Sequence, residues 1–120
     1  MTNIGKTFAN TSIVSFNELR YFGITALWDT AMENCGKLES ITLPESLTYM
    51  GWGALQRCPA LDRVIILNSE SVVEITSSTF SSTPILDGVY VPDNLVEEYK
   101  IANNWVNIAD RIKPLSEYTE

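Results

Sequence analysis

Histidine is absent from the 120 residues of this chain. Its absence removes the catalytic pairs in which an imidazole activates a Ser or Cys nucleophile, and it removes most zinc sites, which need imidazole ligands. The glycine-rich patterns GxGxxG and GxxxxGK(S/T), which cradle phosphate groups, are missing as well. We therefore expect a non-enzymatic protein that uses no cofactor and no metal ion.

Basic residues are scarce, with 8 Lys and Arg against 15 Asp and Glu, and the net charge is -7. Nucleic acids and anionic membrane surfaces are bound by clustered positive charge, so we expect neither as a partner. No apolar run approaches the roughly 18 residues of a membrane span, so we expect no membrane insertion. The first residues, Met1–Thr7, lack the apolar region of a signal peptide. This predicts an intracellular or virion-associated protein, unless the chain is a piece of an exported surface protein.

The sequence does contain an internal repeat. The segments 31–44 and 54–67 align without gaps at an offset of 23, with identities that include the pair Cys35 and Cys58. A third, degenerate copy over residues 79–92 follows at an offset of 25. Repeats of this length need their neighbours, because one unit cannot bury its apolar edge alone.

Each repeat predicts one short strand, and neighbouring strands are expected to form a parallel ladder. In residues 38–43, the side chains of Leu38, Ile41 and Leu43 are expected to point inward, and the polar residues between them outward. Across the three repeats, the residues expected to be buried are Leu38, Ile41, Leu43, Leu61, Val64, Ile66, Leu86, Val89 and Val91.

Residues 38–58 read LESITLPESLTYMGWGALQRC. This stretch resembles the BspA-like leucine-rich repeat, whose pattern is roughly L-x-x-I-x-L-P-x-S-L-x-x-I-G-x-x-A-F-x-x-C. The resemblance implies an α/β fold, a short right-handed solenoid of about three coils with helical caps. It also implies a binding or structural role, since such repeats occur in bacterial surface proteins that adhere to matrix or cells, and in phage-encoded proteins.

The flanking residues predict the two caps of a single domain over 1–120. Residues 1–23 form the expected N-terminal cap, with a helix over 15–22 that begins at a Ser15–Glu18 capping box. Residues 24–92 form the repeats. Residues 93–120 form the expected C-terminal cap and tail.

Within the C-terminal cap, Asp93 is expected to cap a helix over residues 94–101. A second turn over residues 104–110 is expected to place Trp105 inward, and residues 117–120 are expected to fray.

The outward positions of the stacked strands form the first candidate site, called here the strand face: Glu39, Thr42, Asp62, Arg63, Ile65, Asp87 and Tyr90. We expect Ile65 and Tyr90 to be exposed apolar anchors within an acidic rim, which would suit a basic protein partner or a second copy of the chain. The alternative is an ordinary solvated edge. A second candidate on the convex side is formed by Trp28 and Trp52, which could contact protein or sugar or simply pack within the fold.

Cys35 and Cys58 occupy equivalent positions in neighbouring repeats, so they are expected to stack as buried, reduced thiols, with a disulfide as the alternative.

Taken together, the features of the sequence predict a non-enzymatic protein-binding or structural module. The alternative is a carbohydrate-active enzyme or an enzyme inhibitor, which would place two carboxylates at one cleft.

Overall fold

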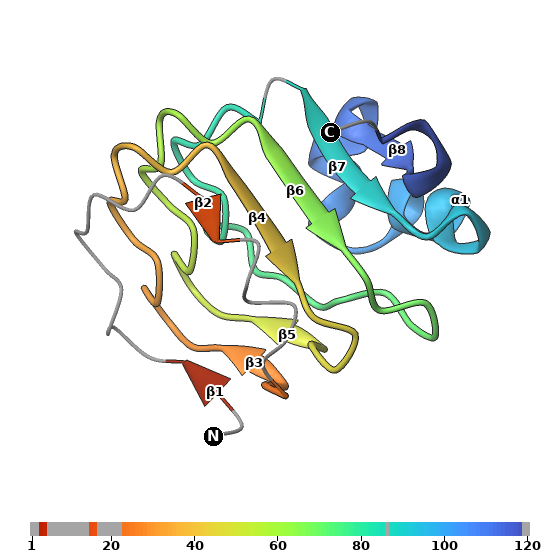
Figure 1. Ribbon diagram of the computed structural model, residues 1–120, viewed down its shortest axis with the longest axis horizontal. Helices are drawn as coiled ribbons and strands as arrows, with labels where there is room; N and C mark the ends of the chain where they lie inside the picture. The colour runs from red at the N-terminus through yellow and green to blue at the C-terminus, as the bar shows by residue number, and fades with distance from the viewer. Residues whose placement is uncertain (1–2, 5–14, 17–22, 86, 119–120) are drawn as a thin grey trace.

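The chain is built on two parallel β-sheets that run side by side (Figure 1). The computed structural model describes residues 3–4, 15–16, 23–85 and 87–118. The first sheet contains β1 (Asn3–Ile4), β3 (Ala26–Leu27) and β5 (Tyr49–Met50). The second contains β2 (Ser15–Phe16), β4 (Ser40–Leu43), β6 (Arg63–Ile66), β7 (Gly88–Val91) and β8 (Ile112–Pro114).

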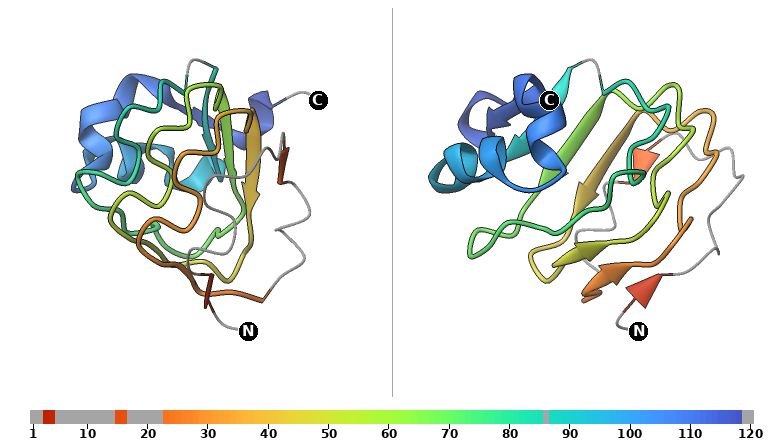
Figure 2. Two further views of the ribbon diagram at one scale, coloured as in Figure 1. Left: turned by 90° about the vertical axis from the view of Figure 1, so that its left-hand side faces the viewer. Right: turned by 180° about the vertical axis from the view of Figure 1, so that it is seen from behind.

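The pairing register reproduces the repeat length found in the sequence. Ser40 pairs with Arg63 at an offset of 23, and Arg63 pairs with Gly88 at an offset of 25. In the first sheet, Ala26 pairs with Tyr49, again at an offset of 23. All of these pairs are parallel, as predicted, and two further views show the strands of each sheet stacked in chain order (Figure 2).

The core lies between the two sheets and the connecting turns. Eight of the nine residues predicted to be buried have exposed fractions of 0%, which confirms the alternation read from the sequence. The ninth, Leu86, lies outside the described residues. The backbone repeats as well, because Asn34, Arg57 and Ser82 occupy equivalent turn positions and all have a φ between 55° and 60°.

The C-terminal segment supplies side chains that close the end of the first sheet. Its elements are η3 (Asp93–Leu95), α1 (Val96–Ile101), η4 (Trp105–Arg111) and η5 (Leu115–Glu117). The backbone N–H of Val73 donates to the Tyr99 hydroxyl at 2.9 Å, and Trp105 Nε1 donates to the Val73 carbonyl at 2.7 Å. Asn104 Nδ2 donates to the carbonyl of Ile75 at 2.8 Å. These bonds satisfy backbone groups that would otherwise lack partners at a sheet edge.

Three predictions about the ends of the chain are wrong. Ser15–Phe16 is a strand paired with Ser40–Ile41, so no helix begins at Ser15; residues 17–22 of that predicted helix lie outside the described residues. Asp93 does not cap a helix, because its carboxylate accepts the backbone N–H of Ser116 at 3.1 Å. Glu117 does not begin a frayed tail, since it ends η5 and the next residue, Tyr118, packs on Tyr90; residues 119–120 of that predicted tail lie outside the described residues.

Candidate functional site

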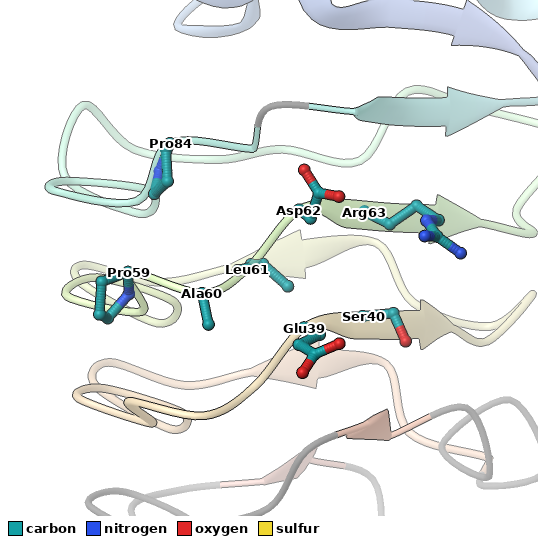
Figure 3. Close-up of a pocket in the computed structure, with 8 residues that line it drawn as sticks. All are labelled: Glu39, Ser40, Pro59, Ala60, Leu61, Asp62, Arg63 and Pro84. Carbon is teal, nitrogen blue, oxygen red and sulfur yellow. The ribbon is translucent and has the colours of Figure 1, made fainter.

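An open groove of about 410 Å³ lies where β4 and β6 begin (Figure 3). Glu39 and Asp62 immediately precede these strands, and Ser40 and Arg63 are the first residues within them. The remaining lining comes from the turns that lead into β6 and β7: Pro59, Ala60, Leu61 and Pro84. The groove therefore joins a polar wall on the strands to an apolar wall on the turns.

The charges around the groove are unevenly paired. Arg63 Nε lies 3.0 Å from Asp87 Oδ2, a close charge contact that is not aligned as a hydrogen bond, and Lys113 Nζ lies 3.8 Å from Asp87 Oδ1. Asp62 Oδ1 accepts the backbone N–H of Asp87 at 2.8 Å. Among the described residues, the exposed Glu39 carboxylate has no cationic partner. Among the described residues, the Arg63 and Lys113 side chains are thus both directed to Asp87, and neither forms an ion pair with Glu39 or Asp62.

The structure places the seven predicted strand-face residues in two groups. Glu39 is exposed and Asp62, Arg63 and Asp87 are half-buried, which leaves these four available to a ligand. The other three belong to a single row across the sheet, Thr42 beside Ile65 and Ile65 beside Tyr90.

The prediction that Thr42, Ile65 and Tyr90 are exposed is wrong. Their exposed fractions are 5%, 4% and 6%. Side chains that face each other across neighbouring strands cover one another, which accounts for part of this burial. Tyr90 is covered further by the C-terminal segment, where the Tyr118 ring packs edge-on at 5.1 Å and Lys113 Nζ lies 5.8 Å from the ring centre. Ile65 and Tyr90 are therefore not the exposed apolar anchors that the sequence suggested.

The same C-terminal contacts shape the electrostatics of this face. The Tyr90 hydroxyl donates to the Asp87 carboxylate at 3.2 Å, and burial together with the Asp87 charge raises the pKa of Tyr90. A hydrogen bond with Tyr118 and the nearby charge of Asp87 raise the pKa of Arg63. At pH 7 the Tyr90 phenol is therefore uncharged and the Arg63 guanidinium is positively charged.

The second candidate pair, Trp28 and Trp52, does reach the surface. Their exposed fractions are 47% and 56%, so neither ring is buried in the core. They lie just after β3 and β5 of the first sheet, whereas the strand residues of the groove belong to the second. The Trp28 ring packs edge-on against Tyr49 at 6.1 Å.

Cys35 and Cys58 are free thiols and fully buried, as predicted. A hydrogen bond with the Cys35 thiol and, to a smaller extent, burial raise the pKa of Cys58.

In the described part of the chain, no group of three or more His, Cys, Asp or Glu residues is placed to hold a metal ion. No helix in that same part is long and apolar enough to cross a membrane.

The lining of the groove can be compared with what the carbohydrate-active alternative requires. Two carboxylates at one opening is the arrangement that the carbohydrate-active alternative requires, but none of the described lining residues is aromatic, so no platform for a sugar ring is present there. Sequence reasoning missed the turn residues Pro59, Ala60 and Pro84. In the sequence, only their position before the strands distinguishes these residues. That position indicates a wall of the groove only when the turns are seen stacked beside one another.

Comparison with known proteins agrees with the repeat register. The sequence model for the BspA type leucine rich repeat region matches residues 1–109 in six copies, a span that extends beyond the predicted repeats over 24–92 at both ends. No curated protein matches the chain in sequence. The family implies a repeat solenoid fold with α/β content, is generally non-enzymatic, and indicates a protein-binding or structural module. Since the match covers most of the 120 residues, the chain belongs to the BspA-type leucine-rich-repeat family.

Proposed function

We propose that the chain is a non-enzymatic protein-binding module whose groove at the start of β4 and β6 holds a basic segment of a protein partner. The observation that carries this proposal is the Glu39 carboxylate at the opening of the groove, which has no cationic partner among the described residues and lies beside the half-buried Asp62. An unpaired carboxylate next to a second one raises the local concentration of cations and favours a basic ligand.

The two walls of the groove fit the two parts of a Lys or Arg side chain. Such side chains lay their aliphatic stems along apolar surface and keep their charged ends at polar groups. Pro59, Ala60 and Pro84 offer the apolar wall, and Glu39 and Asp62 offer acceptors for the charged end. Arg63 is held by Asp87 and borders the groove on its strand side, where it would repel a second cation.

The module is proposed to act as one domain over residues 1–120, a right-handed solenoid with its repeats over 24–92 and residues 93–120 closing the C-terminal end. The hydrogen bonds between the side chains of Tyr99, Asn104 and Trp105 and the backbone of Val73 and Ile75, beside the bridge from Glu74 to β5, support the closing role. The settings that the family resemblance suggests are surface adhesion and a phage or virion component. Both settings use a binding surface and neither needs catalysis.

The proposal is tested with a fluorescein-labelled octalysine peptide and fluorescence anisotropy in about 50 mM NaCl, where exposed charges are weakly screened. Replacing Glu39→Gln and Asp62→Asn together keeps side-chain size and removes both charges. We expect the peptide to bind the variant at least about tenfold more weakly than the parent protein.

The matched control replaces Glu97→Gln and Glu98→Gln, two exposed acids of α1 that lie outside the groove. It changes the net charge by the same amount. If both double variants lose affinity equally, the peptide responds to overall charge only, and the groove is not a specific site.

A further inference from the structure

We infer a second interaction surface, distinct from the groove, that takes the cationic side chains of a protein partner through aromatic rings. It consists of Trp28, Tyr49 and Trp52 with the neighbouring carboxylates of Asp29 and Glu74, and is called here the aromatic patch. It lies on the first sheet and just beyond it, whereas the groove lies on the second.

Trp28 and Trp52 are exposed, although burying their apolar rings would stabilise the fold. Among the described residues, the large hydrophobic side chains that remain exposed are Trp28, Trp52, Ile101 and Val106. The third tryptophan, Trp105, is fully buried, and tryptophan side chains are highly buried on average, so about half-exposed rings are unusual. Trp28 and Trp52 also come from neighbouring repeats, and the backbones that carry them lie side by side, because β3 and β5 pair just before the two residues.

The backbone around these rings is held in place before any ligand arrives. The backbone N–H of Trp52 donates to Asp29 Oδ1 at 2.9 Å, and the Trp52 carbonyl accepts the N–H of Thr30 at 2.9 Å. The Gly51 N–H donates to the Leu27 carbonyl at 2.8 Å. Trp28 is fixed differently, by the edge of the Tyr49 ring, with an angle of 66° between the two planes. Such preorganisation lowers the entropy lost on binding.

The charge around the rings selects the kind of ligand. Glu74 is exposed and pairs with Tyr49 in the parallel ladder, and Asp29 is exposed beside Trp52. No ion pair of either carboxylate is present among the described residues. The described segments that form this side, 23–30, 48–54 and 72–78, contain no Lys or Arg.

An aromatic face attracts a cation, and a nearby carboxylate adds to that attraction. A Lys ammonium or an Arg guanidinium uses both features of the aromatic patch. A neutral sugar would stack on the rings and donate hydroxyl hydrogen bonds to the carboxylates, but it would leave their negative charge uncompensated, and an acidic partner would be repelled by them. Charge complementarity therefore favours a basic segment of a protein as the occupant.

The test uses a fluorescein-labelled peptide of alternating Arg and Gly, titrated by anisotropy at about 50 mM NaCl. The parent for this test is the groove variant Glu39→Gln with Asp62→Asn, which leaves the aromatic patch as the proposed site for the peptide. In it we expect the pair Trp28→Ala and Trp52→Ala to weaken binding about tenfold or more, and Glu74→Gln to weaken it by a smaller factor. The pair Trp28→Phe and Trp52→Phe keeps the aromatic faces and should recover part of the affinity. It also keeps the test informative if the alanine variant folds poorly.

The matched control is Ile101→Ser with Val106→Ser, which removes exposed apolar surface elsewhere and should leave affinity unchanged. Unchanged affinity in the tryptophan variants would overturn the inference. So would saturable quenching of tryptophan fluorescence by cellohexaose with none by the Arg-Gly peptide, since that result marks a sugar surface. The groove variant Glu39→Gln with Asp62→Asn separates the two proposals, because it should leave the contribution of the tryptophans intact.

Discussion

Gly51 has no Cβ, and the aromatic patch depends on the close contact between repeats that this allows. A Cβ built on Gly51 would lie 2.2 Å from Asp29 Oδ1 and 2.8 Å from the backbone nitrogen of Asp29. The first of these atoms could move, but the second belongs to the backbone of the neighbouring repeat. The glycine therefore allows the close approach through which Asp29 accepts the Trp52 N–H.

Replacing Gly51→Ala should lower the free energy of unfolding by about 2 kcal/mol, because the added methyl group forces the two repeats apart. Urea denaturation followed by circular dichroism measures the change. The control is Gly36→Ala, since a Cβ at Gly36 meets nothing within 4 Å. Equal stability of the two variants would show that the close approach at Gly51 is not needed for the fold.

The buried thiols support a second prediction at the same scale. Cys58 Sγ donates to the Met32 carbonyl at 3.2 Å and lies in the core with Cys35, so Cys58→Ala should cost about 1 to 2 kcal/mol through lost packing. The raised pKa of Cys58 keeps it protonated and unreactive in the native protein. We expect a thiol reagent to react with both cysteines only after denaturation. Reaction that appears only after a reducing agent is added would instead mean that the two are joined by a disulfide.

The strand face shows why burial was predictable from the sequence on one side of the sheet only. Ile41 and Val64 point into a core that the repeat itself creates, so their alternation with polar residues was sufficient evidence. Ile65 and Tyr90 are outward in the same alternation, and a single strand gives no sign that its outer side is covered. That cover includes Tyr118, which follows Tyr90 by more than a full repeat, in a part of the sequence with no repeat signal.

At the scale of elements, local pattern and long-range pairing compete. Phe16, Leu19 and Phe22 have the spacing of one helix face, which is why the sequence predicted a helix there. Ser15–Phe16 instead pairs with β4, because a strand at this position extends the parallel ladder by one further member. The C-terminal helices were more predictable. Leu95 and Tyr99 are four residues apart, as on one face of a helix, and both are buried; Trp105 is buried as predicted.

The contact between the C-terminal segment and the first sheet gives a prediction about pH. Burial raises the pKa of Tyr99 from its ordinary value of 10.0 to about 12, so the folded state favours the neutral phenol. The stability that comes from this preference is complete below pH 10 and is lost as the pH rises from about 10 to about 12. A difference of about two pKa units corresponds to about 2 to 3 kcal/mol.

The comparison variant is Tyr99→Phe, in which the N–H of Val73 loses its acceptor. At neutral pH it should be less stable by about 1 to 3 kcal/mol, since a buried donor is left without a partner. Between pH 10 and pH 12, however, its stability should fall less steeply than that of the parent protein. Equal slopes in the two proteins, measured by urea denaturation across this range, would mean that Tyr99 does not control the alkaline limit.

At the scale of the whole molecule, the net charge of -7 favours basic partners over a second copy of the chain. The groove presents Glu39 and Asp62, and the aromatic patch presents Asp29 and Glu74. Contact between two copies through either surface, or between one surface and the other, would bring carboxylates together. Like charges brought together across an interface cost free energy and slow association.

We therefore predict that the chain is a monomer in solution at low ionic strength. Size-exclusion chromatography with light scattering, in about 50 mM NaCl, should give the mass of a single chain over the whole accessible concentration range. Adding a basic peptide should shift the mass by whole peptide units without joining two chains. A stable dimer at low salt would contradict the prediction, because it would require an interface whose apolar contacts outweigh the repulsion. The exposed Ile101 and Val106 of the C-terminal segment would then be the first residues to replace, since they carry no acidic group and are not part of either proposed surface.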